Sequence, residues 1–112
     1  MKQKILKAAR VIRSKNSGPF ELTLDIMFKN RQYFECFRRG KIITRRKIAG
    51  LYGVSPKDIL GIIYFEPACA VKITLRRPLP SGAPGDTDIY GAQQHAPLLN
   101  LKFHLTSCRP KT

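Results

Sequence analysis

The residues with the clearest chemical potential lie in the segment 78–97, where two carboxylates and an imidazole occur close together. Asp86 and Asp88 flank Thr87, and His95 follows a short way on. Paired carboxylates with an imidazole suit a hard cation such as Mg²⁺, Mn²⁺ or Fe²⁺ better than zinc. An Asp-x-Asp in a Gly/Pro-rich segment is also typical of turns, in which the carboxylates accept backbone N–H bonds. We rank turn chemistry above a metal site, and we predict no cofactor.

Two further polar groups are candidates for binding a ligand or a partner. Gln93 and Gln94 precede His95 and provide neutral hydrogen-bonding groups, which suit recognition or simply an exposed polar arm. The other group combines cations, hydroxyls and an amide, and consists of Arg13, Ser14, Lys15 and Asn16. Such a group can cradle a phosphate or a carboxylate, but an ordinary polar hairpin turn explains it equally well.

A carboxylate and a thiol within expected secondary structure need separate interpretations. Asp25 lies on the polar side of an alternating segment. It is a candidate acid or base, although pairing with a Lys or Arg on a neighbouring strand is the favoured interpretation. Cys36 adjoins Phe37 and is interpreted as a small buried thiol. Three cysteines without Cys-x-x-Cys spacing indicate neither a disulfide framework nor a zinc site, which favours a reducing, cytoplasmic location.

The elements that position these residues follow from the apolar pattern. Residues 21–28 alternate apolar and polar side chains, which predicts a half-buried strand, and residues 59–65 and 70–76 predict two more. Residues 5–12 fit either a helix or a strand. Residues 13–19 predict the hairpin-like turn that leads into strand 21–28.

Capping residues predict two short helices between these strands. Asn30 is placed to begin a helix that ends at Gly40, and Thr44 to begin a second that ends at Gly53. The sequence from Ser55 to Asp58 then places a cap, a proline and a carboxylate in the order that begins a helical turn. This order of elements predicts an α+β fold with helices on one face of an antiparallel sheet.

The whole chain, 1–112, is expected to form one domain with a single core. Five apolar side chains are predicted to lie in the core of the sheet: Leu24, Ile26, Ile63, Val71 and Ile73. Segment 78–97 has no helical or strand period and is interpreted as a long Gly/Pro-rich C-terminal arm. Its partner-facing anchors would be Ile89, Tyr90, Leu98 and Leu99. A closing strand is expected over about 98–105.

Net charge is the other strong signal in this chain. Lys and Arg exceed Asp and Glu by 21 to 7, a formal charge of +14, which is typical of proteins that bind polyanions. Solvated faces that keep a protein soluble explain such charge equally well. Because no nucleic-acid motif accompanies it, nucleic acid is a possible but less favoured partner. No apolar run is long enough to span a membrane, so no membrane partner is expected.

Two stretches, residues 10–28 and 51–99, carry a resemblance to a known family. The most specific part is GDTDIYGAQQHAPLL, at 85–99. Over nearly its whole length the chain resembles the small-protein family called domain of unknown function 4387. Members of that family are similar to the ferredoxin-like C-terminal domain of AtuA-like proteins, the acyclic terpene utilisation family, and are encoded beside or fused to an AtuA-like partner. By this resemblance RSKNSGPFELTLDI occupies the place of the R-S-G-D-K-G-D turn and the following strand of the AtuA-like family, and Asn16 and Pro19 stand where that turn has acidic residues.

The resemblance implies a ferredoxin-like antiparallel sheet and an accessory role. We expect a small subunit that works with an AtuA-like partner, or with further copies of itself, in the catabolism of branched or organic acids. Acyl-CoA or carboxylate substrates would fit such a complex, and any activity would be of the lyase or hydratase type. The alternative is a basic protein that binds nucleic acid or another polyanion.

Overall fold

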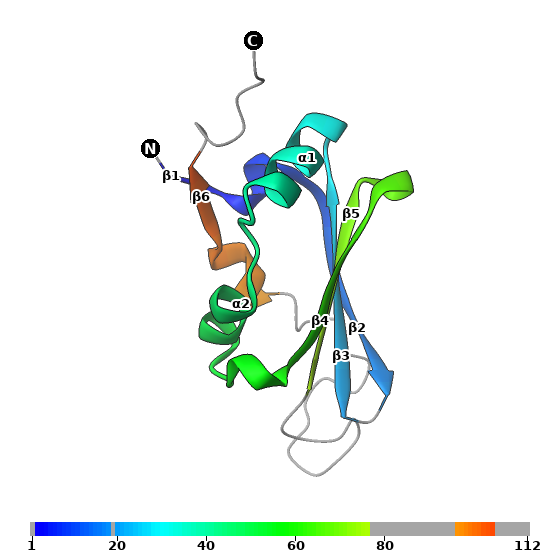
Figure 1. Ribbon diagram of the computed structural model, residues 1–112, viewed down its shortest axis with the longest axis vertical. Helices are drawn as coiled ribbons and strands as arrows, with labels where there is room; N and C mark the ends of the chain where they lie inside the picture. Colours follow the sequence, from blue (N-terminus) through cyan, green and yellow to red (C-terminus); the bar gives the residue numbers. More distant parts are fainter. Residues whose placement is uncertain (1, 19, 77–95, 105–112) are drawn as a thin grey trace.

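Two short helices and several smaller elements cover one face of a four-stranded antiparallel sheet (Figure 1). The computed structural model describes residues 2–18, 20–76 and 96–104. The sheet strands, in spatial order, are β2 (Ala9–Gly18), β3 (Glu21–Phe28), β5 (Ala70–Arg76) and β4 (Ile59–Phe65). The helices are α1 (Arg31–Arg39) and α2 (Arg45–Tyr52). The α+β class with helices beside an antiparallel sheet is therefore confirmed.

The smaller elements complete the layer on the helical side. Strands β1 (Lys2–Lys4) and β6 (Lys102–His104) pair antiparallel in a separate two-stranded sheet. The described residues also form the 3-10 helices η1 (Ile5–Lys7), η2 (Pro56–Asp58), η3 (Glu66–Ala68) and η4 (Ala96–Asn100). Within the described residues, the part of 98–105 that forms a strand is Lys102–His104, which follows a 3-10 helix and pairs with β1 instead of joining the main sheet.

The main sheet consists of two hairpins joined by a helical crossover. Hairpin β2–β3 leads through α1 and α2 to hairpin β4–β5, and β5 then pairs with β3. In a βαββαβ ferredoxin-like order, the edge strand beside the first strand arrives last, after a second crossover. Here that edge strand is β2, which precedes β3 in the chain. The expected ferredoxin-like topology is therefore not confirmed.

Side-chain caps explain where the helices begin and end. The Asn30 side chain accepts a hydrogen bond from the Tyr33 backbone N–H at 2.9 Å, and the Thr44 hydroxyl accepts one from Lys47 at 3.2 Å. Gly53 ends α2 with φ of 65°, a left-handed conformation that glycine adopts without strain. These local interactions confirm the predicted helices.

The core lies between the helices and one face of the sheet. Phe37 of α1 lies between Phe28 of β3 and Phe103 of β6, with ring centroids 4.7 and 4.9 Å away. The Tyr64 hydroxyl donates a hydrogen bond to the Phe37 carbonyl oxygen at 3.2 Å and so links β4 to α1. Partial burial raises the pKa of Tyr64 to about 12. The core therefore joins the sheet, the first helix and the C-terminal strand.

The N-terminal region is extended rather than helical. Residues 9–18 form the long edge strand β2, so the turn expected over 13–19 is reduced to the connection after Gly18. Residues 5–12, whose pattern fits either a helix or a strand, form the 3-10 helix η1 and then the beginning of strand β2. This region matters for the site because it places Arg13 on the surface of the sheet.

A bulge in β4 overturns one of the predicted core positions. Ile59 pairs with Leu75 and Ile62 pairs with Ile73, with a register shift between Ile59 and Gly61. The extra residue reverses which side chains face the helices beyond it. Ile63, predicted as core, is consequently 61% exposed on the opposite face. The other four predicted core residues, Leu24, Ile26, Val71 and Ile73, are buried as expected.

Candidate functional site

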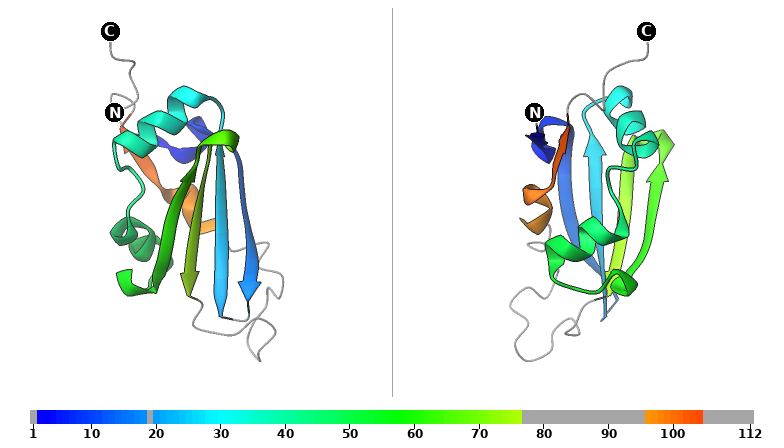
Figure 2. Two further views of the ribbon diagram at one scale, coloured as in Figure 1. Left: turned by 45° about the vertical axis from the view of Figure 1, so that its right-hand side comes forward. Right: turned by 60° about the vertical axis from the view of Figure 1, so that its left-hand side comes forward.

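The face of the sheet opposite the helices is covered by none of the described elements, and the views in Figure 2 show its four strands side by side. We call this surface the open face. Its side chains form rows that cross all four strands, because residues in register on antiparallel strands lie side by side. One row is charged and contains Arg13, Asp25, Lys72 and Ile63. The next row is apolar and contains Val11, Met27, Ala70 and Phe65.

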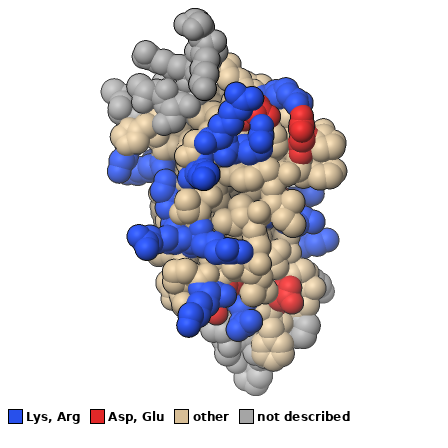
Figure 3. All heavy atoms as spheres, viewed as in Figure 1, with Lys and Arg blue, Asp and Glu red and all other residues tan. Residues whose placement is uncertain are grey.

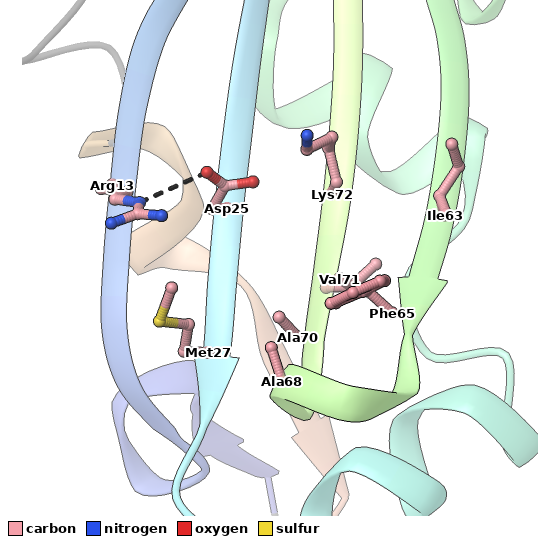
Figure 4. A pocket seen from close by; sticks show the side chains of 9 residues that line it. All are labelled: Arg13, Asp25, Met27, Ile63, Phe65, Ala68, Ala70, Val71 and Lys72. Atoms are coloured by element: carbon pink, nitrogen blue, oxygen red, sulfur yellow. Dashed lines mark hydrogen bonds and ion pairs between the residues drawn. The ribbon is translucent and has the colours of Figure 1, made fainter.

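Between these rows the open face is hollowed, as Figure 4 shows from close by. The hollow has a volume of about 370 Å³ and includes Met27, Ala68 and Ala70 in its lining. Ile63 and Phe65 rise beside it and are 61% and 55% exposed. The small side chains of Ala68 and Ala70 lie beside the large side chains of Ile63 and Phe65 on the edge strand β4. This difference in size produces a shallow, mainly apolar depression.

An ion pair lies at one side of the hollow. Arg13 Nε lies 3.3 Å from Asp25 Oδ2, and the Asp25 side chain is only 17% exposed while that of Arg13 is 61% exposed. Lys72 neighbours Asp25 on the opposite strand. This arrangement confirms that Asp25 pairs across the sheet. The one carboxylate that lines the hollow in the described part of the chain is therefore held by a cation.

The four candidates at 13–16 do not form one cradle. Successive side chains of a strand point to opposite faces. Arg13 and Lys15 are exposed on the open face, whereas Ser14 is buried against the helical layer and Asn16 is half-buried on that same side. The segment is strand rather than the expected turn, so these four side chains do not lie on one side of the sheet.

The other sequence candidates lie outside the described residues. These are Asp86, Thr87, Asp88, Tyr90, Gln93, Gln94 and His95. Two anchors proposed for the same arm are described, however, and Leu98 is fully buried in the domain's own core while Leu99 is half-buried. Leu98 is therefore a core residue rather than a docking anchor. Among residues 2–18, 20–76 and 96–104, no group of His, Cys, Asp and Glu could hold a metal ion.

The cysteines differ from what their spacing suggested. Cys36 in α1 is buried and disulfide-bonded, so it is not a free thiol. Cys69, at the end of η3, is free and half-buried. Because Cys36 is disulfide-bonded, the cysteine pattern no longer supports the expectation of a reducing compartment. Within the described ranges, no helix has the length and apolar character needed to cross a membrane.

Sequence reasoning missed the apolar part of the open face. Met27, Ile63 and Phe65 were not identified as site residues. A signal was present in the run GIIYF at 61–65, which carries more large apolar side chains than one face of a strand can present to a core. A mainly apolar strand at the edge of a sheet with helices on one side indicates that its second face also has a use.

Comparison with known proteins gives one match. No curated protein and no solved structure matches the chain. A family model described as a domain of unknown function (DUF4387) matches residues 5–102. That range includes every strand of the main sheet and both helices, so the match covers the elements that build the open face. The chain therefore belongs to the DUF4387 family.

Proposed function

We propose that this chain is a small accessory subunit that docks on a larger AtuA-like protein through its open face. The complex would act in the catabolism of branched or organic acids, on acyl-CoA or carboxylate substrates. The larger protein would carry out a lyase or hydratase reaction. The observation that carries the docking proposal is that two large apolar side chains, Ile63 of the charged row and Phe65 of the apolar row, are exposed beside the hollow.

Exposed apolar side chains grouped around a depression are typical of protein contact surfaces. Ile63 and Phe65 extend from the edge strand, and Met27 and Ala70 line the hollow beside them. The charged row adds a polar margin, because Arg13, Asp25 and Lys72 lie next to the apolar row. An apolar centre with a charged margin is the usual composition of an interface.

The electrostatics of the open face support docking over catalysis. The Asp25 carboxylate already pairs with the Arg13 guanidinium, so the carboxylate that lines the hollow is occupied by an ion pair within the chain. We therefore assign the chemical step to the partner.

The ferredoxin-like relationship also belongs to this proposal. Strands β3 and β5 are antiparallel, as are β5 and β4, so β3 and β4 run in the same direction on either side of β5. A helical crossover joins β3 to β4, as in one half of a βαββαβ fold. We propose that the sheet is a ferredoxin-like arrangement whose remaining edge strand, β2, comes from the N-terminal side.

Binding to the AtuA-like protein of the same cell tests the docking proposal. The test variant is Ile63→Ser with Phe65→Ser, and the control is Leu6→Ser with Phe20→Ser, which alters an equally exposed aliphatic and aromatic pair outside the hollow. Burying what remains exposed of Ile63 and Phe65 is worth about 2–3 kcal/mol together, so we expect the dissociation constant to rise on the order of 30- to 150-fold.

Size-exclusion chromatography with light scattering measures complex formation, and melting curves show whether each variant is folded. We expect the wild type and the control to co-elute with the partner and the test variant to elute alone while still folded. Equal co-elution of all three proteins would reject the open face as the docking surface. The wild type could instead bind only to itself, and the test variant could lose that self-association. That result would reject an AtuA-like protein as the partner that binds the open face.

A further inference from the structure

A second hollow, on the helical side of the molecule, is surrounded by cations. It has a volume of about 370 Å³ and lies between β1, α2, η4 and β6. The cations are Lys2 of β1, Arg46 and Lys47 of α2, and Lys102 of β6. In Figure 3 Lys and Arg atoms gather on this side of the molecule with few Asp or Glu atoms between them. We call this depression the basic hollow.

Tertiary structure assembles the basic hollow from distant parts of the chain. The pairing of β1 with β6 places Lys4 opposite Lys102 and Lys2 opposite His104. The first turns of α2 then bring Arg46 and Lys47 to the same depression. Because the chain segments come from both ends and the middle, the clustering of these charges is a property of the fold.

The cations of the basic hollow have no acidic partner among the described residues. Each ion pair in that part of the chain involves another arginine: Arg13, Arg31, Arg38 or Arg39. No acidic residue occupies the first turn of α2, and none lines the hollow where the structure describes it. Four cations that line one depression would each stabilise an anion bound there.

The basic hollow is unobstructed at Gly50. Gly50 of α2 lines it, and a Cβ atom added at Gly50 would meet nothing within 4 Å. Asn100 adds an amide that can donate a hydrogen bond. The volume is at the lower end of the range of small-molecule sites.

We propose that the basic hollow binds a small molecule that carries phosphate groups, held by Lys2, Arg46, Lys47 and Lys102. A compact phosphate ester fits better than a nucleic-acid strand, because strand binding uses an extended groove and aromatic side chains for base stacking. No aromatic residue lines the hollow within the described ranges. This inference does not depend on the open face or on the partner proposed for it.

Matched substitutions at Gly50 test the proposal without removing any cation. Gly50→Glu places a carboxylate among the four cations, and Gly50→Gln places a neutral side chain of nearly the same shape there. Both should fold, since the position is exposed and unobstructed. A second comparison uses two double variants. One carries Arg46→Gln and Lys47→Gln. Its control carries Arg10→Gln and Lys29→Gln, which removes one arginine and one lysine from exposed positions outside the hollow.

Isothermal titration with inorganic pyrophosphate on the full chain is the measurement. We expect Gly50→Glu and the Arg46/Lys47 variant to bind about tenfold or more weakly, the loss typical of a charge-assisted hydrogen bond. Gly50→Gln and the Arg10/Lys29 variant should bind within about threefold of wild type. No measurable pyrophosphate binding by wild type, or equal losses in both double variants, would overturn the proposal.

A single-stranded oligonucleotide provides the competing arm of the experiment. We expect it to bind more weakly than pyrophosphate at the basic hollow and to be insensitive to Gly50→Glu. Tighter oligonucleotide binding that falls equally in the Arg46/Lys47 and Arg10/Lys29 variants would show that overall charge attracts polyanions. That result would overturn the basic hollow as a specific site.

Discussion

Ile73 and Ile63 form a matched pair of isoleucines on adjacent strands that should respond oppositely to truncation. Ile73 is fully buried against the helices, whereas Ile63 is 61% exposed on the open face. Emptying a packed isoleucine site costs about 2–5 kcal/mol, because transfer energy is lost and a cavity remains. Ile63 has only a minor part of its surface buried, so Ile63→Ala should cost about 1 kcal/mol.

Urea unfolding followed by circular dichroism measures both variants. With a slope of about 2 kcal/mol per molar for a domain of this size, Ile73→Ala should lower the midpoint by about 1–2.5 M and Ile63→Ala by about 0.5 M. The slope itself should not change. Equal midpoint shifts, or a larger shift for Ile63→Ala, would refute the register of β4 and with it the assignment of Ile63 to the open face.

Three further predictions concern charge, a buried hydroxyl and the arm. A hydrogen bond from Arg38 lowers the pKa of Glu35. The ionised carboxylate therefore stabilises the fold fully when the pH is above the ordinary pKa of Glu. This stabilisation is lost as the pH falls through the lowered pKa. Glu35→Gln should thus lower the melting temperature at about pH 7 and have no effect at about pH 2. Tyr64→Phe removes the hydrogen bond to Phe37 and should cost about 0.5–1.5 kcal/mol in urea unfolding. Because burial raises the pKa of Tyr64 to about 12, the stabilisation is complete below about pH 10 and lost as pH rises toward 12. Tyr90→Ala should weaken assembly with the AtuA-like protein in size-exclusion chromatography without changing the melting curve; unfolding of this variant would instead place Tyr90 in the core.

The helix boundaries and strand 21–28 could be predicted from the sequence because the interactions that set them are local. Asn30 and Thr44 cap backbone groups only a few residues ahead, so their spacing is enough to locate the helix starts. The alternation in residues 21–28 identified Leu24 and Ile26 as buried because no bulge interrupts β3 where it pairs with β5. The position of Asp25 on the opposite face followed from the same period.

Tertiary structure alone decided which side chains share a surface. The face of Ile63 depends on one bulge, which arises where β4 pairs with β5 and leaves no mark in the period of β4 itself. Arg13 and Ser14 are neighbours in sequence but point to opposite sides, because 13–18 continues as strand instead of turning. Net charge was evident from composition, whereas the gathering of cations around the basic hollow required β1 to pair with β6 from the other end of the chain. Non-local pairing fixes register and face, and the pattern within one strand does not show which distant segment it pairs with or in which register.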